Sequence, residues 1–208
     1  MKRASGQGCL WVVSAPSGAG KTSLVRALMD SEPDLCFATS YTTRPQREGE
    51  VHGVDYLFVD EAEFEAMVER GEFLEHATVF GNRYGTGRRQ VEQELAAGRD
   101  VLLEIDWQGA HQVRRRMSEA RSIFILPPSR EALEARLRKR GTDPEEVIRR
   151  RLDEARAEIG HCPEFDFAVI NQDFDQALAE LRRVMAGGNG ALAADRAEIR
   201  SLVDRLLQ

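Results

Sequence analysis

The residues best suited to chemistry form one short run near the N-terminus, read A-P-S-G-A-G-K-T. This run fits the phosphate-binding loop G-x-x-x-x-G-K-[ST], with an alanine in place of the first glycine. Its glycines let successive backbone N–H groups curl around an anion. Its lysine adds a positive charge for the β- and γ-phosphates, and its threonine offers a hydroxyl to Mg²⁺. The predicted ATP-binding residues of the loop are Ala15, Pro16, Ser17, Gly18, Ala19, Gly20, Lys21 and Thr22.

An ordinary glycine-rich turn between a strand and a helix could carry the same glycines. The flanking sequence favours the phosphate loop, because the motif requires a strand before it and a helix after it. The apolar run Leu10–Val13 predicts that strand, and the spacing of Leu24, Val25 and Leu28 predicts that helix. The helix N-terminus then points its positive dipole end at the bound phosphate. The sequence therefore predicts a site for a nucleoside triphosphate and Mg²⁺.

Two further groups of arginines could hold phosphate. Arg44 and Arg47 are three residues apart in a polar stretch that begins at Ser40, and a planar guanidinium suits a phosphate group. Arg136 and Arg140 are four residues apart, on one face of a predicted helix. Solvated surface arginines are the alternative in each case. A phosphoryl-transfer site, however, needs cations that arrive as the site closes and excludes water.

The order of predicted elements indicates an α/β protein. Nearly continuous apolar runs at Asp100–Ile105, Ser122–Leu126 and Phe167–Ile170 are typical of strands with both faces covered. Leu35–Ala38 reads as a further short strand, and helical segments separate the runs. This alternation predicts a doubly wound, mostly parallel sheet.

The block 40–98 differs from the rest of the chain because it opens with a polar stretch and has only short strands, expected at Tyr56–Val59 and Phe73–Phe80. Asp60–Glu63 is a capping box that predicts a helix through Val68, halted by Gly71. We interpret the block as an insertion with its own small sheet beside the phosphate site. The predicted core is then 1–39 and 99–208.

Two further helical segments are predicted in the core. The Arg-rich segment Ser129–Gly160 contains a helix capped at Thr142–Glu145, with a proline in its first turn, and Ile148, Leu152, Ala155 and Ile159 form its apolar stripe. It supplies a predicted helical lid at about 136–158. After a glycine-rich joint, an amphipathic helix is expected over Ala191–Leu207, packed either against the body of the protein or against a second subunit.

Composition limits the classes of partner. The chain has 208 residues, 42% of them hydrophobic, and a net charge of −6, which argues against general binding of nucleic acids or membrane surfaces. Cys9, Cys36 and Cys162 are odd in number and far apart, as expected of reduced thiols. With no apolar stretch long enough for a signal peptide or a membrane span, we expect the protein to lie in the cytoplasm.

Along its whole length the chain resembles bacterial guanylate kinases. The resemblance lies in the phosphate loop, in Ser40–Glu50, Gly53–Tyr56, Phe73–His76 and Gly81–Thr86, and in Glu104–Gly109 and Arg140–Thr142. Their order and spacing together are more specific than any one of them. The resemblance implies transfer of the γ-phosphoryl group of ATP to GMP, with Mg²⁺, and a fold in which the insertion 40–98 binds the monophosphate.

The resemblance also implies individual roles. It assigns the GMP phosphate to Ser40, Arg44, Arg47, Tyr56 and Tyr84, and the guanine base to Glu75, Thr86 and Asp106. A carboxylate suits guanine, which presents two donors, whereas adenine would turn an acceptor towards it. The implied lid residues are Arg136, Arg140 and Arg151, and Asn171 corresponds to the adenine side of ATP. With Lys21 and Arg44, the three lid arginines make up the predicted catalytic set.

Other readings of these residues stay open. Tyr56 and Tyr84 could be half-buried packing residues, and Glu75 could be an exposed acid at a strand end. Glu104 either lies near Mg²⁺ through a water molecule or pairs with a neighbouring arginine. Glu104 and Asp106 lie at or just beyond the end of the strand expected over Asp100–Ile105.

Three other functions share some of these sequence features. Another nucleoside monophosphate kinase would share the loop and the lid but need a different base pocket. A non-catalytic guanylate-kinase-like module would bind phosphorylated proteins at the acceptor site, and the intact Lys21 and Thr22 argue against it. A nucleic-acid-dependent ATPase is disfavoured by the net charge. Whether the chain forms a homo-oligomer is left open by the sequence.

Overall fold

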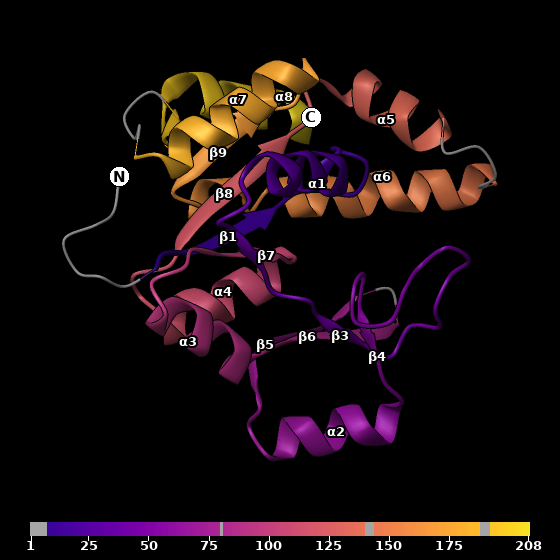
Figure 1. Ribbon diagram of the computed structural model, residues 1–208. Helices are drawn as coiled ribbons and strands as arrows, with labels where there is room; N and C mark the ends of the chain where they lie inside the picture. The colour runs from indigo at the N-terminus through magenta and orange to yellow at the C-terminus, as the bar shows by residue number, and fades with distance from the viewer. Residues whose placement is uncertain (1–7, 80, 140–143, 188–191) are drawn as a thin grey trace. The chain divides into compact units, whose positions relative to one another are not determined.

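The computed structural model describes residues 8–79, 81–139, 144–187 and 192–208 (Figure 1). The chain divides into two compact units, and the division falls within the first strand. Unit 1 comprises Val13–Glu32 and Arg121–Gln208, and unit 2 comprises Pro33–Ala120 with the segment up to Val12.

The larger sheet has five strands, in the order β2-β7-β1-β8-β9. β2 pairs in parallel with β7, and β8 pairs in parallel with β9. The side chains of β1 are all buried, as predicted for a strand covered on both faces. These findings confirm the predicted α/β class with a mostly parallel sheet. The strands are β1 (Leu10–Ser14), β2 (Cys36–Phe37), β7 (Val101–Glu104), β8 (Arg121–Leu126) and β9 (Phe167–Ile170).

Unit 2 contains a second, four-stranded sheet in the order β4-β3-β6-β5, which confirms the predicted small sheet. β3 pairs in parallel with β4, and β6 pairs antiparallel with both β3 and β5. β5 therefore lies at one edge of this sheet. The strands are β3 (Tyr41–Thr42), β4 (Leu57–Phe58), β5 (Phe73–Val79) and β6 (Asn82–Gly87). The predicted last residue of β5, Phe80, lies outside the described residues.

Helix α2 (Glu61–Glu69) covers part of the small sheet. Its N-cap is Asp60, whose carboxylate accepts from the N–H of Glu63 at 2.8 Å, as the capping box predicts. Phe64 stacks on Phe73 of β5 with ring centroids 4.6 Å apart. The apolar face of α2 thus anchors the strand that carries Glu75.

Unit 2 also contains α3 (Arg88–Ala96) and α4 (Trp107–Arg116), and α4 packs along β5 (Figure 1). The preceding strand β7 ends at Glu104, so Asp106 does not continue it. Instead, the carboxylate of Asp106 caps α4 by accepting from the N–H of Gly109 at 2.9 Å. A capping aspartate favours the start of a helix, so the strand does not extend to Asp106.

The helices of unit 1 follow the predicted order. Helices α5 and α6 contact each other. Along α6, Ile148, Ala155 and Ile159 are buried, and Leu152 is half-buried. The unit 1 helices are α1 (Lys21–Ser31), α5 (Arg130–Lys139), α6 (Glu145–Ile159), the 3₁₀ turn Cys162–Glu164, α7 (Phe174–Met185) and α8 (Ala197–Leu207).

Two predicted helix starts differ from the structure. Pro144 takes the N-cap position of α6 rather than a place in its first turn, and Thr142 lies outside the described residues. The C-terminal helix begins at Ala197 and not at Ala191, which is itself undescribed. Before it, Ala193 forms an antiparallel bridge with Phe167, and the N–H of Ala194 donates to Asp166. The edge of β9 satisfies this backbone, so the helix starts later.

The apolar side of α8 is buried within this chain. Ile199, Leu202, Val203 and Leu206 are all buried, and α8 contacts α6 of the same unit. Of the two roles expected for this helix, the structure favours packing against the body of the protein. None of the described helices has the length and apolarity needed to cross a bilayer.

Candidate active site

The phosphate loop connects β1 to α1 in unit 1 and adopts the expected turn. Gly18 and Gly20 have φ angles of 87° and 93°, in the left-handed region that favours glycine. The N–H of Ala19 closes the turn by donating to the carbonyl of Pro16 at 3.1 Å. Gly20 is the N-cap of α1 and has no side chain to cover the first-turn N–H groups. These groups and the helix dipole therefore favour an anion at this position.

Lys21 and Thr22 begin helix α1, directly after the loop. Lys21 is half-buried and Thr22 is exposed. Their position at the N-terminus of the helix is the one in which a lysine and a hydroxyl can reach phosphate and its cation. Lys21 and Thr22 therefore lie at the helix N-terminus where the sequence predicts the phosphate-binding site.

Asn171 and Arg136 support the loop from elsewhere in unit 1. The side-chain amide of Asn171 donates to the carbonyl of Ala19 at 2.7 Å, and Asn171 is only 5% exposed. The guanidinium of Arg136 donates to the carbonyl of Asn171 at 2.7 Å and to that of Ala19 at 3.4 Å. A Cβ atom on Gly20 would lie 2.5 Å from the Asn171 amide nitrogen. Gly20 is therefore required both by its φ angle and by the approach of Asn171.

Helix α6 contributes two more side chains to the loop. Arg151 donates to the hydroxyl of Ser17 at 3.1 Å. The N–H of Ser17 donates to a carboxylate oxygen of Glu158 at 2.9 Å. Arg151 is a predicted lid residue, and the structure brings it to the phosphate loop, as it does Arg136. Arg140, the third predicted lid arginine, lies outside the described residues.

Glu158 was missed by the sequence analysis. Its carboxylate contacts a residue 141 positions away in the chain. An acid within a helix rich in charges reads as part of a solvated face, so no local signal distinguishes it. Only the packing of α6 beside the loop reveals the contact.

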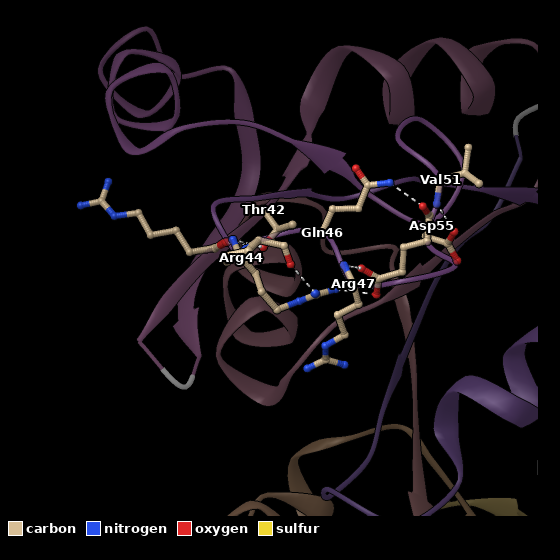
Figure 2. A network of polar contacts seen from close by, with 9 residues as sticks. Thr42, Arg44, Gln46, Arg47, Val51 and Asp55 are labelled. Carbon is tan, nitrogen blue, oxygen red and sulfur yellow. Dashed lines mark hydrogen bonds and ion pairs between the residues drawn. The ribbon is translucent and has the colours of Figure 1, made fainter.

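The predicted phosphate clamp of the monophosphate lies in unit 2, on the loop after β3 (Figure 2). The guanidinium of Arg44 pairs with Glu50 at 2.7 Å and lies over the ring of Tyr56, 5.3 Å from its centroid. The N–H of Arg47 donates to the second oxygen of Glu50 at 2.8 Å. The Arg44 guanidinium lowers the pKa of the Glu50 carboxyl by this hydrogen bond. Glu50 therefore organises both arginine positions, a role that the sequence analysis did not assign.

The remaining phosphate candidates flank this loop. Ser40 is 9% exposed, whereas the Arg47 side chain is exposed and points away from the contacts drawn in Figure 2. Tyr56 and Tyr84 lie edge to face, with ring centroids 5.9 Å apart. Burial, followed by the nearby carboxylate of Glu104, raises the pKa of Tyr56 to about 12. Its hydroxyl therefore stays protonated and able to donate at neutral pH.

The predicted base-reading residues lie together in unit 2. Glu75 and Thr86 are opposite one another on β5 and β6, and the Thr86 hydroxyl donates to Oε1 of Glu75 at 2.6 Å. Glu75 is 2% exposed, so it is not the exposed strand-end acid of the alternative reading. Burial raises the pKa of Glu75 to about 7, the hydrogen bond from Thr86 lowers it, and the carboxylate of Asp106 adds to the rise. A buried carboxyl with a shifted pKa is typical of a functional site.

Comparison with known proteins finds similarity to guanylate kinases over most of the chain. The family model described as guanylate kinase matches residues 7–187. A guanylate kinase of Methylococcus capsulatus is 59% identical over 179 residues, covering 86% of this chain and 88% of that protein. A guanylate kinase of Salmonella typhimurium is 51% identical over 203 residues, covering 97% of this chain and 98% of that protein.

The structure agrees with a solved relative. The crystal structure of a guanylate kinase from Anaplasma phagocytophilum matches with a TM-score of 0.74 and 32% sequence identity, and the match covers 98% of each chain. A family model over most of the residues, relatives above 50% identity and a shared fold all point to one assignment. This chain belongs to the guanylate kinase family.

Proposed function

We propose that the protein transfers the γ-phosphoryl group of ATP to GMP, giving ADP and GDP. The observation that carries this proposal is the buried carboxyl of Glu75, held by Thr86 in a chain that also has a phosphate loop. Burying a carboxylate is costly even with one hydrogen bond, and a ligand that donates to it offsets that cost. Guanine is such a ligand.

Base selectivity follows from the arrangement of donors. The N1–H and the exocyclic amine of guanine both donate, so one carboxylate can accept from both. Adenine would turn an acceptor towards Glu75 and leave the buried charge unpaired, a mismatch that can cost several powers of ten in selectivity. Asp106 lies close enough to raise the pKa of Glu75 and is the proposed third contact of the base.

The acceptor phosphate is proposed to bind Ser40, Arg44, Arg47, Tyr56 and Tyr84. Arg44 is already held between Glu50 and the ring of Tyr56, so little side-chain freedom is lost when it binds phosphate. Arg47 is exposed and can turn towards an incoming phosphate. The protonated hydroxyl of Tyr56 can donate to an oxygen of the same group.

The donor nucleotide is proposed to bind the phosphate loop, with Lys21 on its β- and γ-phosphates. Arg136 and Arg151 are the cations placed to cover the migrating charge, since both already contact the loop. Arg140 is proposed to join them. Asn171 supports the loop through Ala19 and is the proposed residue on the adenine side.

Mg²⁺ is the implied cofactor, and the donor set fits it. Among the described residues no group of three or more His, Cys, Asp or Glu side chains could hold a metal ion. Mg²⁺ in phosphoryl-transfer enzymes is held mainly by substrate phosphates, with few protein ligands. The Thr22 hydroxyl, an oxygen donor in the first turn of α1, suits that arrangement. When bound, the ion would neutralise charge on the β- and γ-phosphates.

The reaction needs no general base from the protein. The second pKa of a phosphate monoester is near 6, so the acceptor phosphate is mostly dianionic at neutral pH and attacks directly. The protein supplies position and positive charge: Lys21 and the lid arginines on the donor, Arg44 and Arg47 on the acceptor. Exclusion of water keeps ATP from being hydrolysed instead. Cys9, Cys36 and Cys162 form no disulfide within the part of the chain that the structure describes, which suits the reducing cytoplasm where we place the reaction.

The test is ADP production by the purified protein with Mg²⁺-ATP and GMP, AMP, CMP, UMP or dTMP in turn. Strong turnover with GMP alone is expected. Turnover with another base would retain the kinase and reject the Glu75 pocket. GMP binding without turnover would favour the non-catalytic binding module.

A second measurement separates the donor and acceptor sites. Lys21→Met removes the charge on the donor side and keeps the length of the side chain. Turnover should fall by several powers of ten, while calorimetric binding of GMP alone should stay within about twofold. Equal losses in both would contradict separate sites.

A further inference from the structure

Helix α4 completes the edge of β5 on both sides of Glu75. β5 is an edge strand of the small sheet, so one row of its backbone groups has no partner strand. The side chain of Gln112 takes that place at His76: its amide nitrogen donates to the His76 carbonyl at 2.6 Å, and its oxygen accepts from the His76 N–H at 3.2 Å. One side chain thus reproduces the two hydrogen bonds of a neighbouring strand.

Arg116 holds the strand on the other side of Glu75 by donating to two successive carbonyls. Its guanidinium donates to the carbonyl of Phe73 at 3.1 Å and also to the carbonyl of Leu74. The register of β5 against β6 shifts between Phe73 and Glu75, so this stretch is an irregular strand. Irregular strands re-aim side chains and need their backbone groups satisfied. Arg116 and Gln112 therefore fix the residues immediately before and after Glu75.

Gly109 leaves the space in which the Glu75 carboxylate lies. A Cβ atom at Gly109 would stand 2.5 Å from Oε2 of Glu75 and 3.1 Å from its carboxyl carbon. One carboxylate oxygen is held by Thr86, and the other therefore occupies the space left by the missing side chain. Because Gly109, Gln112 and Arg116 follow at helical spacing, they all lie on the face of α4 that meets β5.

We propose that Gln112 and Arg116 are positioning residues for the base-reading carboxylate and that Gly109 is a specificity determinant of the acceptor site. The inference rests on the proposed function, since it concerns how Glu75 selects guanine over adenine. A carboxylate that is displaced or free to rotate loses its simultaneous contact with the two guanine donors. Selectivity should then fall even though the phosphate clamp is unchanged.

The first test compares Gln112→Met with the wild-type protein. The methionine keeps the length of the side chain and removes both hydrogen bonds to His76. We expect the KM for GMP to rise about tenfold or more and the ratio of kcat/KM for GMP over AMP to fall similarly, with the KM for ATP within about twofold. Arg116→Met should act in the same direction, and Arg116→Lys, which keeps a donor, should recover part of the loss. Arg115→Met, at the exposed neighbour, is the matched control and should change neither value.

A double-mutant cycle separates positioning from general stability. In a Glu75→Gln background, Gln112→Met should change the GMP to AMP ratio by less than about twofold, because the carboxylate it positions is gone. A merely structural role would reduce activity equally in both backgrounds. An undiminished effect in the Glu75→Gln background would overturn the proposal.

Gly109→Ala tests the same idea in a variant that should fold well. Alanine is the better helix former, which offsets part of the cost of displacing the buried carboxylate, so the variant should still fold, yet the KM for GMP should increase about tenfold or more. Glu75→Asp, whose carboxylate is set back by one methylene, should lose less through Gly109→Ala than the wild type does. If Gln112→Met fails to fold, Gly109→Ala decides the matter, and unchanged GMP selectivity in that variant would refute the proposal. Absence of GMP turnover in the wild type would instead refute the proposed function.

Discussion

The hydroxyl of Thr86 donates a 2.6 Å hydrogen bond to Oε1 of Glu75, inside the small sheet of unit 2. Glu75 is almost completely buried, and burial raises its pKa to about 7, while the Thr86 hydrogen bond opposes that rise. The carboxyl is thus balanced between its two protonation states near neutral pH. Its proposed role as an acceptor for guanine requires the ionised state, so both base binding and stability should depend on pH.

Binding of the base should weaken as the pH falls below about 7. Only the carboxylate accepts from both guanine donors, so protonation of Glu75 in the free protein competes with the base. Guanosine is the appropriate probe, because it lacks the phosphate that titrates near pH 6. Its inhibition constant against GMP should be level above pH 7 and rise about tenfold per unit at lower pH. A flat profile from pH 5.5 to 8 would contradict this role of Glu75.

Glu75 should also make protein stability depend on pH, but stability should fall as the pH rises, whereas base binding strengthens. The pKa of Glu75 is raised in the folded state, so its contribution to stability is full below the unfolded pKa of 4.5 and is lost as the pH rises through about 7. The shift corresponds to about 3 kcal/mol in the free energy of unfolding. Glu75→Gln should therefore stabilise the ligand-free protein at pH 8 relative to pH 4.5. Denaturant unfolding at the two pH values measures the difference, and an equal effect at both would count against it.

Replacing Thr86 with valine should weaken GMP binding and move its pH dependence. Valine keeps the shape of the side chain and removes the donor, and a hydrogen bond to a charged group contributes about 1.5–3 kcal/mol. We expect a ten- to hundredfold rise in the KM for GMP. The pH at which guanosine binding weakens should also move above 7, because the bond that lowers the pKa of Glu75 is lost. Thr78→Val, at an exposed position of β5, serves as the control.

Arg44 should not be replaceable by lysine without loss of GMP affinity. Its guanidinium pairs with Glu50 and lies over the ring of Tyr56, a geometry that depends on the planar fork. Arg44→Lys keeps the charge, yet the KM for GMP should rise about tenfold or more, with little change in the KM for ATP. The matched control is Arg70→Lys, since Arg70 forms an exposed ion pair with Glu72 in the same unit. Equal kinetics for both variants would show that charge alone suffices.

Replacing Asn171 should weaken ATP binding and leave GMP binding unchanged. Asn171→Ala removes the hydrogen bond to the carbonyl of Ala19 and loosens the phosphate loop. The loss of a buried hydrogen bond of about 1 kcal/mol predicts a roughly fivefold or greater rise in the KM for ATP. GMP binding by calorimetry should be unaffected. Gln172→Ala, at the neighbouring exposed position, is the control and should leave the KM for ATP unchanged.

Local sequence determined the elements and several functional positions of this protein. The phosphate loop was predictable because its glycines, lysine and threonine lie consecutively and act through backbone geometry. The capped helix α2 and the buried strands were predictable for the same reason, since capping and apolar runs are local signals. The acceptor residues required the family resemblance in addition, because isolated arginines and acids are more often solvated.

Tertiary structure decided which distant groups meet. Nothing local indicates that Glu158 accepts from Ser17, that Glu50 holds Arg44, or that β9 pairs with Ala193 and delays α8. Gly109 shows the difference most clearly: in the sequence it is an unfavourable residue in a helix, and in the fold it provides the space for the Glu75 carboxylate. Residue type sets which hydrogen bonds and conformations are available, but the packing of α4 against β5 determines which of them form.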